Sequence, residues 1–117
     1  MALHTQLPIY QVAYRLFDLG LDLAKNMPRD LKQSVGGKFR DECIEIMVLI
    51  FRANVSREKT PHLDALIEHL QVAELMLRVS RDKHLISVGQ YAKAVELTTS
   101  VGKQASGWRR SAISPAS

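Results

Sequence analysis

The sequence predicts an all-α protein, an antiparallel up-down-up-down four-helix bundle. Apolar residues recur at spacings of three and four in four successive segments, no segment alternates apolar and polar residues as a strand does, and the connections are short. The chain has 117 residues, of which 46% are hydrophobic, so it can bury one core without metals or disulfides. We expect a single domain over residues 1–110 and a disordered C-terminal tail over residues 111–117, which read "SAISPAS".

The first helix is expected over residues 8–27, where two apolar stripes run side by side. The core stripe consists of Ile9, Val12, Leu16, Leu19, Leu23 and Met27. The second stripe consists of Tyr10, Tyr14, Phe17 and Leu21. One stripe is enough for one seam, so the doubled face predicts contact with more than one neighbour. Pro28 ends the helix because it disfavours the α conformation at the preceding residue.

The second helix raises a question at Gly36 and Gly37, which stand directly before Lys38. Glycines and a lysine at a helix start can bind phosphate, but that motif requires a preceding strand and the spacing GxxxxGK followed by Ser or Thr. The stretch "RDLKQSVGGKF" has neither. The apolar spacing instead continues in phase across the pair, through Leu31, Val35, Phe39, Cys43, Ile46, Ile50 and Ala53. Because two glycines cost a helix interior about 2 kcal/mol relative to alanine, we predict that both serve a close approach of a neighbouring helix.

Apolar residues cover most of the circumference of this second helix. Beyond the core positions they are Ile44, Met47, Val48, Leu49, Phe51 and Val55. A helix that is apolar on nearly all sides is buried, either within a bundle or between subunits. Together with the doubled stripe of the first helix, this pattern predicts a homo-oligomer in the form of a closed ring.

The third and fourth helices carry start signals. Thr60 is expected to be the N-cap of the third helix, with Pro61 at its first position. The core face of this helix consists of Leu63, Leu66, Leu70, Ala73 and Leu77. Ser87 and Gln90 have capping-box spacing at the start of the fourth helix. The core side of that helix is expected to consist of Tyr91, Val95, Thr98, Gly102 and Ala105.

Cysteine use and hydropathy indicate a cytoplasmic protein. Cys43 is the only cysteine, so it has no partner for an intramolecular disulfide or a thiolate metal site, and we expect a buried thiol in a reducing compartment. The longest uncharged apolar run, "IMVLIF", is far shorter than the roughly 20 residues that span a bilayer. No basic region leads into an apolar segment at the N-terminus, so we expect neither secretion nor a membrane partner.

The sequence supports no catalytic, metal or cofactor site. The four histidines are His4, His62, His69 and His84. His62 and His69 share a helix face, but the Glu-x-x-His motif of a di-metal bundle does not occur, and we expect these histidines to face solvent. Ser and Thr are present without a placed histidine and acid, so no nucleophilic triad is indicated. We therefore predict a protein that is not an enzyme and needs no cofactor.

The charge pattern leaves two interpretations open. The net charge is +4. Arg78 stands four residues from both Glu74 and Asp82. Lys38 stands four residues from Glu42, and such spacing is typical of a solvated, ion-paired face. Alternatively, basic residues gather on the folded surface and bind phosphates without reading sequence. The candidate nucleic-acid-binding residues are Arg52, Arg57, Arg78, Arg81, Lys83, Lys93, Lys103, Arg109 and Arg110.

Three stretches of the sequence resemble a known family. They are "NMPRDLK" after the first helix, "LRVSRDKHLISVGQY" between the third and fourth helices, and "VGKQASGWRR" near the C-terminus, where Gly102 and Trp108 have a Gly-x5-Trp spacing. Over about residues 5–110 the chain resembles the accessory variability determinant (Avd) proteins of diversity-generating retroelements. These are related to the four-helix-bundle proteins encoded by intervening sequences of large-subunit rRNA.

The resemblance implies an assembly and a function. It implies a homopentameric barrel of four-helix protomers with a basic surface, which binds the retroelement's reverse transcriptase and RNA or DNA. Such a protein supports mutagenic retrohoming and has no catalytic activity of its own. The acidic Asp41, Glu42 and Glu45 beside Arg40 depart from a basic surface. The alternative function is a four-helix scaffold, or an rRNA intervening-sequence type of protein, with a protein partner only.

Overall fold

The computed structural model describes residues 3–113. Its long helices are α1 (Pro8–Lys25), α3 (Gly37–Val55), α4 (Thr60–Asp82) and α5 (Val88–Ile113). A 3₁₀ turn (His4–Gln6) precedes α1, and a short helix α2 (Arg29–Leu31) continues through a π-helical turn (Lys32–Gly36) into α3. No strand occurs within residues 3–113. The predicted all-α four-helix bundle is confirmed, because α2, the π-helical turn and α3 form one continuous rod.

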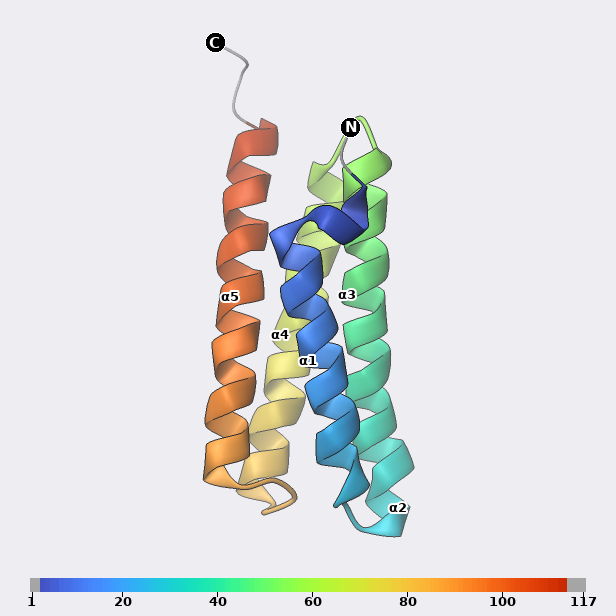
Figure 1. The fold of residues 1–117 in the computed structure, drawn as a ribbon, viewed down its shortest axis with the longest axis vertical. Helices are drawn as coiled ribbons and strands as arrows, with labels where there is room; N and C mark the ends of the chain where they lie inside the picture. The colour runs from blue at the N-terminus through green and yellow to red at the C-terminus, as the bar shows by residue number, and fades with distance from the viewer. Residues whose placement is uncertain (1–2, 114–117) are drawn as a thin grey trace.

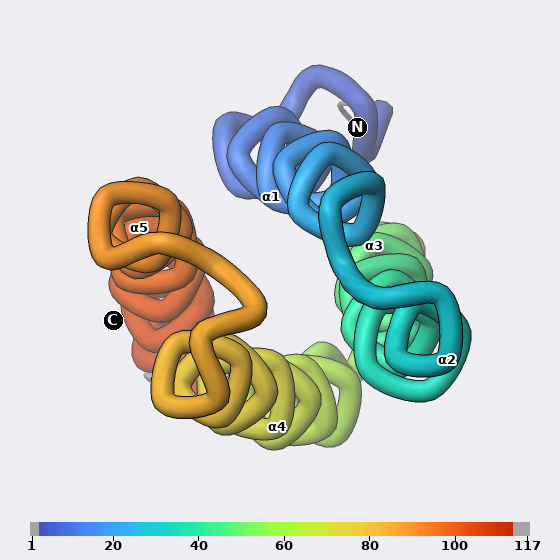
Figure 2. The backbone as a smooth tube through the Cα atoms, turned by 90° about the horizontal axis from the view of Figure 1, so that it is seen from below, coloured from blue at the N-terminus to red at the C-terminus, as the bar shows by residue number. Residues whose placement is uncertain are grey.

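The long helices run alternately in opposite directions along the bundle (Figure 1). Seen along the axis, α1, α3, α4 and α5 occupy four corners in chain order (Figure 2), and packing joins each helix to the next and α5 to α1. The α1/α3 pair and the α4/α5 pair therefore form opposite sides of a rod that measures 52 × 20 × 19 Å. We call the end with the α1–α2 and α4–α5 turns the turn end, and the end with the α3–α4 loop the loop end.

The bundle core contains most of the residues that the apolar spacing places there. Its largest fully buried side chains are Leu16, Ile46, Ile50, Leu63, Leu66, Val101, Thr98 and Cys43. Burial of one large aliphatic side chain contributes about 1.5–3 kcal/mol, so these layers supply the main driving force for folding. Burial, and secondly the charge of Glu42, raise the pKa of the Cys43 thiol to about 12.

The expected core side of α5 is partly wrong. Ala94 and Val101 are buried in the core, whereas Val95 and Gly102 are only half-buried. The core stripe of α5 consists mainly of small side chains, so its spacing stands out less than that of the larger residues beside it. The consequence is a register that differs by one residue position from the expected one over part of the helix.

The glycine prediction is confirmed in one respect and wrong in another. Gly36 and Gly37 are buried and helical, so they form no loop. A Cβ at Gly36 would lie 2.9 Å from the Cβ of Ala24 on α1, which is the expected close approach. A Cβ at Gly37 would meet nothing nearer than 3.7 Å. The atoms at that distance belong to the side chains of Gln33 and Arg40, which lie on the same continuous helix as Gly37. The closest approach is instead at Gly20, where a Cβ would lie 2.6 Å from the Phe39 ring.

The helix ends differ from the expected ones in three places, and α1 ends at Lys25 instead of Met27. Thr60 is the first residue of α4, and Lys59 precedes it in the N-cap position. The ammonium of Lys59 donates hydrogen bonds to the carbonyl oxygens of Ala53, Asn54 and Ser56 at 2.7, 3.2 and 3.0 Å, which closes the C-terminus of α3. Lys59 therefore caps the end of α3, while the start of α4 has no side-chain N-cap.

The fourth helix begins as expected and ends later. The backbone N–H of Ser87 donates to Gln90 Oε1 at 2.8 Å, and the N–H of Gln90 donates to Ser87 Oγ at 3.0 Å, so the predicted capping box is confirmed. Helix α5 continues through residues 111–113 of the expected tail. The rest of that tail, residues 114–117, lies outside the described residues.

Candidate nucleic-acid interface

The nine candidate basic residues do not form one patch. Four of them, Arg78, Arg81, Lys83 and Lys93, lie toward the turn end of α4 and α5. Arg52, Arg57, Arg109 and Arg110 lie toward the loop end. Since an α-helix rises 1.5 Å per residue, Lys93 and Arg109 are separated by roughly 24 Å along α5. The structure therefore divides the candidates into two groups at opposite ends of the bundle, with Lys103 between them.

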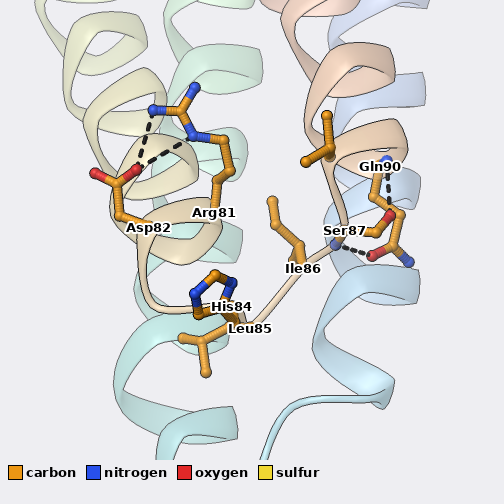
Figure 3. Close-up of a pocket in the computed structure, with 8 residues that line it drawn as sticks. Arg81, Asp82, His84, Leu85, Ile86, Ser87 and Gln90 are labelled. Atoms are coloured by element: carbon orange, nitrogen blue, oxygen red, sulfur yellow. Dashed lines mark hydrogen bonds and ion pairs between the residues drawn. The ribbon is translucent and has the colours of Figure 1, made fainter.

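At the turn end, Arg81 is held by its neighbours. Its Nε and Nη2 atoms donate to Oδ1 of Asp82 at 3.2 and 3.0 Å (Figure 3), and its guanidinium lies 4.5 Å from the centroid of the Tyr91 ring. Because Asp82 pairs with Arg81, the expected pairing of Arg78 with Asp82 is wrong. The expected Arg78–Glu74 pair is also not found among residues 3–113. Arg78 is thus an exposed cation, whereas the charge of Arg81 is partly satisfied within the fold.

The α4–α5 turn at this end surrounds an open hollow of about 720 Å³. Arg81, His84 and Ile86 are among the residues that line it (Figure 3). His84 has a φ of 59°, in the left-handed region. The N–H of Leu85 donates to the Ser80 carbonyl at 2.8 Å and the N–H of His84 to that of Arg81 at 3.0 Å, which is the Schellman pattern. This C-terminal cap fixes the turn and holds the basic residues on either side of it.

Two further basic residues lie at the turn end that sequence reasoning did not select. Arg29 belongs to α2 and Lys32 to the π-helical turn, and both are exposed. They lie about 50 positions from Lys83 in the sequence, but the α1–α2 and α4–α5 turns share one end of the bundle (Figures 1 and 2). The exposed basic residues of the turn end for which no acidic partner is found within residues 3–113 are Arg29, Lys32, Arg78, Lys83 and Lys93.

At the loop end the charges are more often satisfied. Arg109 Nε donates a hydrogen bond to Asp64 Oδ1 across 45 positions of sequence. This hydrogen bond, followed by the negative charge of Asp64, raises the pKa of the Arg109 guanidinium above its usual value. Arg52 and Arg57 are exposed. Lys59 at the same end is fully used as a helix cap, so the loop end offers fewer available cations than the turn end.

A polar cluster joins α3 to α4 in the middle of the bundle. Glu42 is only 6% exposed; Lys38 Nζ lies 3.2 Å from its Oε1, which confirms the expected pair. His69 Nδ1 lies 2.6 Å from Oε2 of the same carboxylate. The helix histidines are half-exposed, as the expectation that they face solvent requires in part, but each also has a partner that the sequence did not indicate: His69 has Glu42, and His62 Nε2 lies 3.0 Å from Ser56 Oγ. These contacts satisfy buried polar groups and leave no carboxylate of the cluster open to a ligand.

Within residues 3–113, no three His, Cys, Asp or Glu side chains are grouped so that they could hold a metal ion. None of the helices in that range combines the length and apolar character that crossing a bilayer requires. What the arrangement does offer is electrostatic: exposed cations at the turn end, on and beside the α1–α2 and α4–α5 turns.

A comparison with protein families gives a match over most of the chain. A family model described as bAvd-like matches residues 7–112. No curated protein and no solved structure matches the chain. The matched range covers α1, α3, α4 and all but the last residue of α5, together with both groups of candidate basic residues.

Proposed function

The chain belongs to the bAvd-like family, and we propose that it is a non-catalytic accessory protein of a diversity-generating retroelement. In this function it binds the reverse transcriptase together with RNA or DNA in the cytoplasm and supports mutagenic retrohoming. The family match supports the accessory role. The observation that supports nucleic-acid contact is the group of exposed, unpaired cations at the turn end, since lysine and arginine contacts to phosphates supply most sequence-independent affinity.

We further propose that copies form a closed ring of five with their bundle axes along the ring axis. In such a ring every turn end lies on the same rim. The group Arg29, Lys32, Arg78, Lys83 and Lys93 is then repeated once per copy around that rim. Repetition raises the effective concentration of a weak phosphate site, which allows a chain with a net charge of only +4 to bind a polyanion usefully.

The turn-end contact is tested by reversing two of its charges. Lys83→Glu with Lys93→Glu changes two exposed residues that have no acidic partner within residues 3–113, so the fold should be retained. We expect weaker binding of single-stranded RNA of any sequence, and a log-log salt dependence that is shallower by about 0.7 for each lost phosphate contact. Arg81 and Arg109 are poorer probes because they pair with Asp82 and Asp64.

The matched control is Arg52→Glu with Arg57→Glu at the loop end. It makes the same change in net charge, on two residues that are also exposed. We expect this variant to keep most of the affinity, because the turn end makes the contact. Equal losses in both variants would mean that net charge matters and position does not. Unchanged affinity and salt slope in the turn-end variant would favour the alternative function, a scaffold with a protein partner only.

A further inference from the structure

The hollow at the α4–α5 turn, which we call the turn hollow, has an apolar lining that phosphate contact does not use. Leu85, Ile86 and Val88 line it beside its polar residues (Figure 3). Val88 is 75% exposed, the highest value of any large apolar residue within residues 3–113. The turn hollow measures about 720 Å³, and sites for small organic ligands measure roughly 300–1,000 Å³. It is therefore large enough to hold a planar ring system.

His84 adds an aromatic ring to this lining (Figure 3). It stands in the left-handed region where α4 ends, with a φ of 59°, and glycine is the usual residue at such a position. His84 is exposed, and its imidazole makes no hydrogen bond or ion pair within residues 3–113. A residue that is held in an uncommon backbone conformation, and whose polar side-chain atoms the fold does not use, is typical of a functional site.

The other polar groups around the turn hollow are used within the fold. Arg81 Nε and Nη2 bind Asp82 Oδ1 at 3.2 and 3.0 Å. The N–H groups of Ser87 and Gln90 donate to each other's side chains in the capping box. The Asp82 carboxylate also lines the hollow, and its negative charge opposes the entry of a phosphate. The turn hollow is thus better suited to a neutral ring than to an anion.

Arg81 offers a second planar group near His84. Its guanidinium lies 4.5 Å from the centroid of the Tyr91 ring, and the pair with Asp82 holds it there. The Arg81 side chain is nevertheless 39% exposed, and it lines the turn hollow. Unpaired nucleobases stack on guanidinium planes and on histidine rings. Arg81 and His84 therefore supply stacking groups, and the aliphatic side chains of the turn supply apolar contact.

Exposed cations flank the turn hollow along the chain. Lys83 directly precedes His84. Lys93 follows Val88 by five positions on α5, which is roughly 7.5 Å along the helix. Neither lysine has an acidic partner in the part of the chain that the structure describes. A strand that places one base in the turn hollow has phosphates on either side of that base, and these two lysines are positioned to bind them.

We propose that the turn hollow binds an unpaired nucleobase, so that the protein prefers single-stranded to double-stranded nucleic acid. This inference rests on the proposed function, and adds to it the class of nucleic acid that is bound. In a duplex the bases are stacked and paired, so their faces cannot enter the hollow. Every base has a π-face, so a stacking site of this kind does not read sequence.

The test compares three DNA probes of equal length with the full chain. They are a single strand of mixed sequence, the same strand in a duplex, and a strand whose nucleotides lack bases. The abasic strand has the same charge as the first probe, so a difference between these two is due to the bases. We expect the single strand to bind roughly 5- to 150-fold more tightly than the abasic strand, as the stacking of one base provides. It should also bind more tightly than the duplex.

Salt separates the two kinds of contact. All three affinities should fall as the salt concentration rises, because each includes phosphate contacts. The ratio between the single strand and the abasic strand should persist, because stacking releases no counterions.

The base-site variant carries His84→Ala with Val88→Ala. Both residues are exposed, and neither change alters the formal net charge, so the fold and the phosphate contacts should be retained. We expect this variant to lose most of the preference for the single strand and to bind the abasic strand as the parent does. The matched control is Val55→Ala with His62→Ala, which makes the same two changes at the loop end and should keep the preference. Far-ultraviolet circular dichroism verifies that both variants fold.

A crosslinking measurement uses the parent protein and so does not depend on the folding of a variant. A single strand that contains thiouracil is irradiated in the presence of the protein, and mass spectrometry identifies the peptide that carries the base. Trypsin cleaves after Lys83 and Lys93, so a base in the turn hollow should label the peptide of residues 84–93.

The outcomes distinguish failure of the base site from failure of the proposed function. Equal affinity of the parent for the single strand and the abasic strand, or crosslinks confined to other peptides, would overturn the base site. Phosphate contact would then still be supported by a loss of affinity in the variant with Lys83→Glu and Lys93→Glu. No binding of any of the three probes would refute the proposed function and the base site together.

Discussion

Where α1 crosses α3, a Cβ at Gly20 would come within 2.6 Å of the Phe39 ring, and one at Gly36 within 2.9 Å of Ala24. Where α4 crosses α5, a Cβ at Gly102 would lie 3.3 Å from the end of the Leu70 side chain. The α1/α3 crossing is thus close enough to need glycine. The α4/α5 crossing is looser and leaves a groove.

The difference has a consequence for the outer surfaces of the two sides. On the α1/α3 side the Phe39 ring occupies the space that a side chain at position 20 would need, and Tyr14 and Phe51 lie on the outside of the bundle. Between α4 and α5 the surface is hollowed, and Glu74, Thr98 and Lys103 are among the residues that line the hollow. The two sides therefore differ in how tightly side chains pack at the positions where glycine lets two helices cross.

The largest effect is expected from adding one methyl group to the close crossing. Gly20→Ala should lower the free energy of unfolding by about 2 kcal/mol, because the buried Phe39 ring has little room to move. Gly37→Ala is the matched control on α3: it meets nothing within 3.4 Å and should raise stability by about 1 kcal/mol through helix propensity. Urea unfolding measures both. A Gly20→Ala protein as stable as the parent would contradict the close crossing.

The next effect concerns the link between the two halves of the bundle. Glu42 on α3 and His69 on α4 are in contact at 2.6 Å, with Glu42 nearly buried. His69→Ala should cost about 1–3 kcal/mol because the Glu42 carboxylate loses a hydrogen bond inside the fold. A double-mutant cycle with Glu42→Ala isolates the coupling. If the two single costs simply add up in the double variant, the contact does not link the helices.

A smaller effect is expected at alkaline pH from Cys43, in the closely packed half. Its folded pKa is about 12 and the ordinary value is 9.0, so the unfolded chain ionises first as the pH rises. The stability contributed by the neutral thiol is therefore complete below pH 9 and is lost progressively up to about pH 12. At pH 10 the loss is roughly 1.4 kcal/mol. Cys43→Ala should lack this part of the alkaline decline, as unfolding curves of both proteins at pH 8 and pH 10 would reveal; parallel declines would disprove it.

The smallest effect is expected at the α4–α5 turn, on the looser side. His84 adopts a φ of 59°, which costs a residue with a Cβ roughly 1 kcal/mol more than glycine. His84→Gly should therefore raise the melting temperature slightly, by an amount that corresponds to about 0.5–1 kcal/mol. His84→Ala keeps the Cβ without the imidazole and serves as the control. A decrease in stability with glycine would show that the histidine side chain, and not the backbone, holds this turn.

Periodicity predicts the four helices and most of the core, because a helix must bury one stripe of apolar residues whatever its partners are. It does not predict which helices touch at which height. The contacts of Gly20 with Phe39 and of Glu42 with His69 depend on the rotation and offset of packed helices, and these are fixed only when all four are assembled. The same holds for Lys59, whose capping role depends on the path of the α3–α4 loop.

The candidate interface could be predicted only as a set of basic residues. The sequence does not reveal that Arg109 is paired with Asp64, which lies 45 positions away, or that Arg81 is held by Asp82 and Tyr91. Nor does the sequence reveal that Arg29 and Lys83 lie at the same end of the bundle. Pairing removes a cation from the candidate interface and folding adds others, so the composition of this candidate surface is a property of the assembled bundle.

Lysine footprinting tests the central claim, that the turn end binds nucleic acid, most directly. The parent protein is acylated with and without a single-stranded RNA, and mass spectrometry reads the modification of each lysine. We predict that Lys32, Lys83 and Lys93 become less reactive when RNA is present, and that Lys59 at the loop end does not change. Raising the salt concentration should remove the protection, because phosphate contacts weaken as counterions compete. Protection confined to the loop end, or no protection at low salt, would contradict the account.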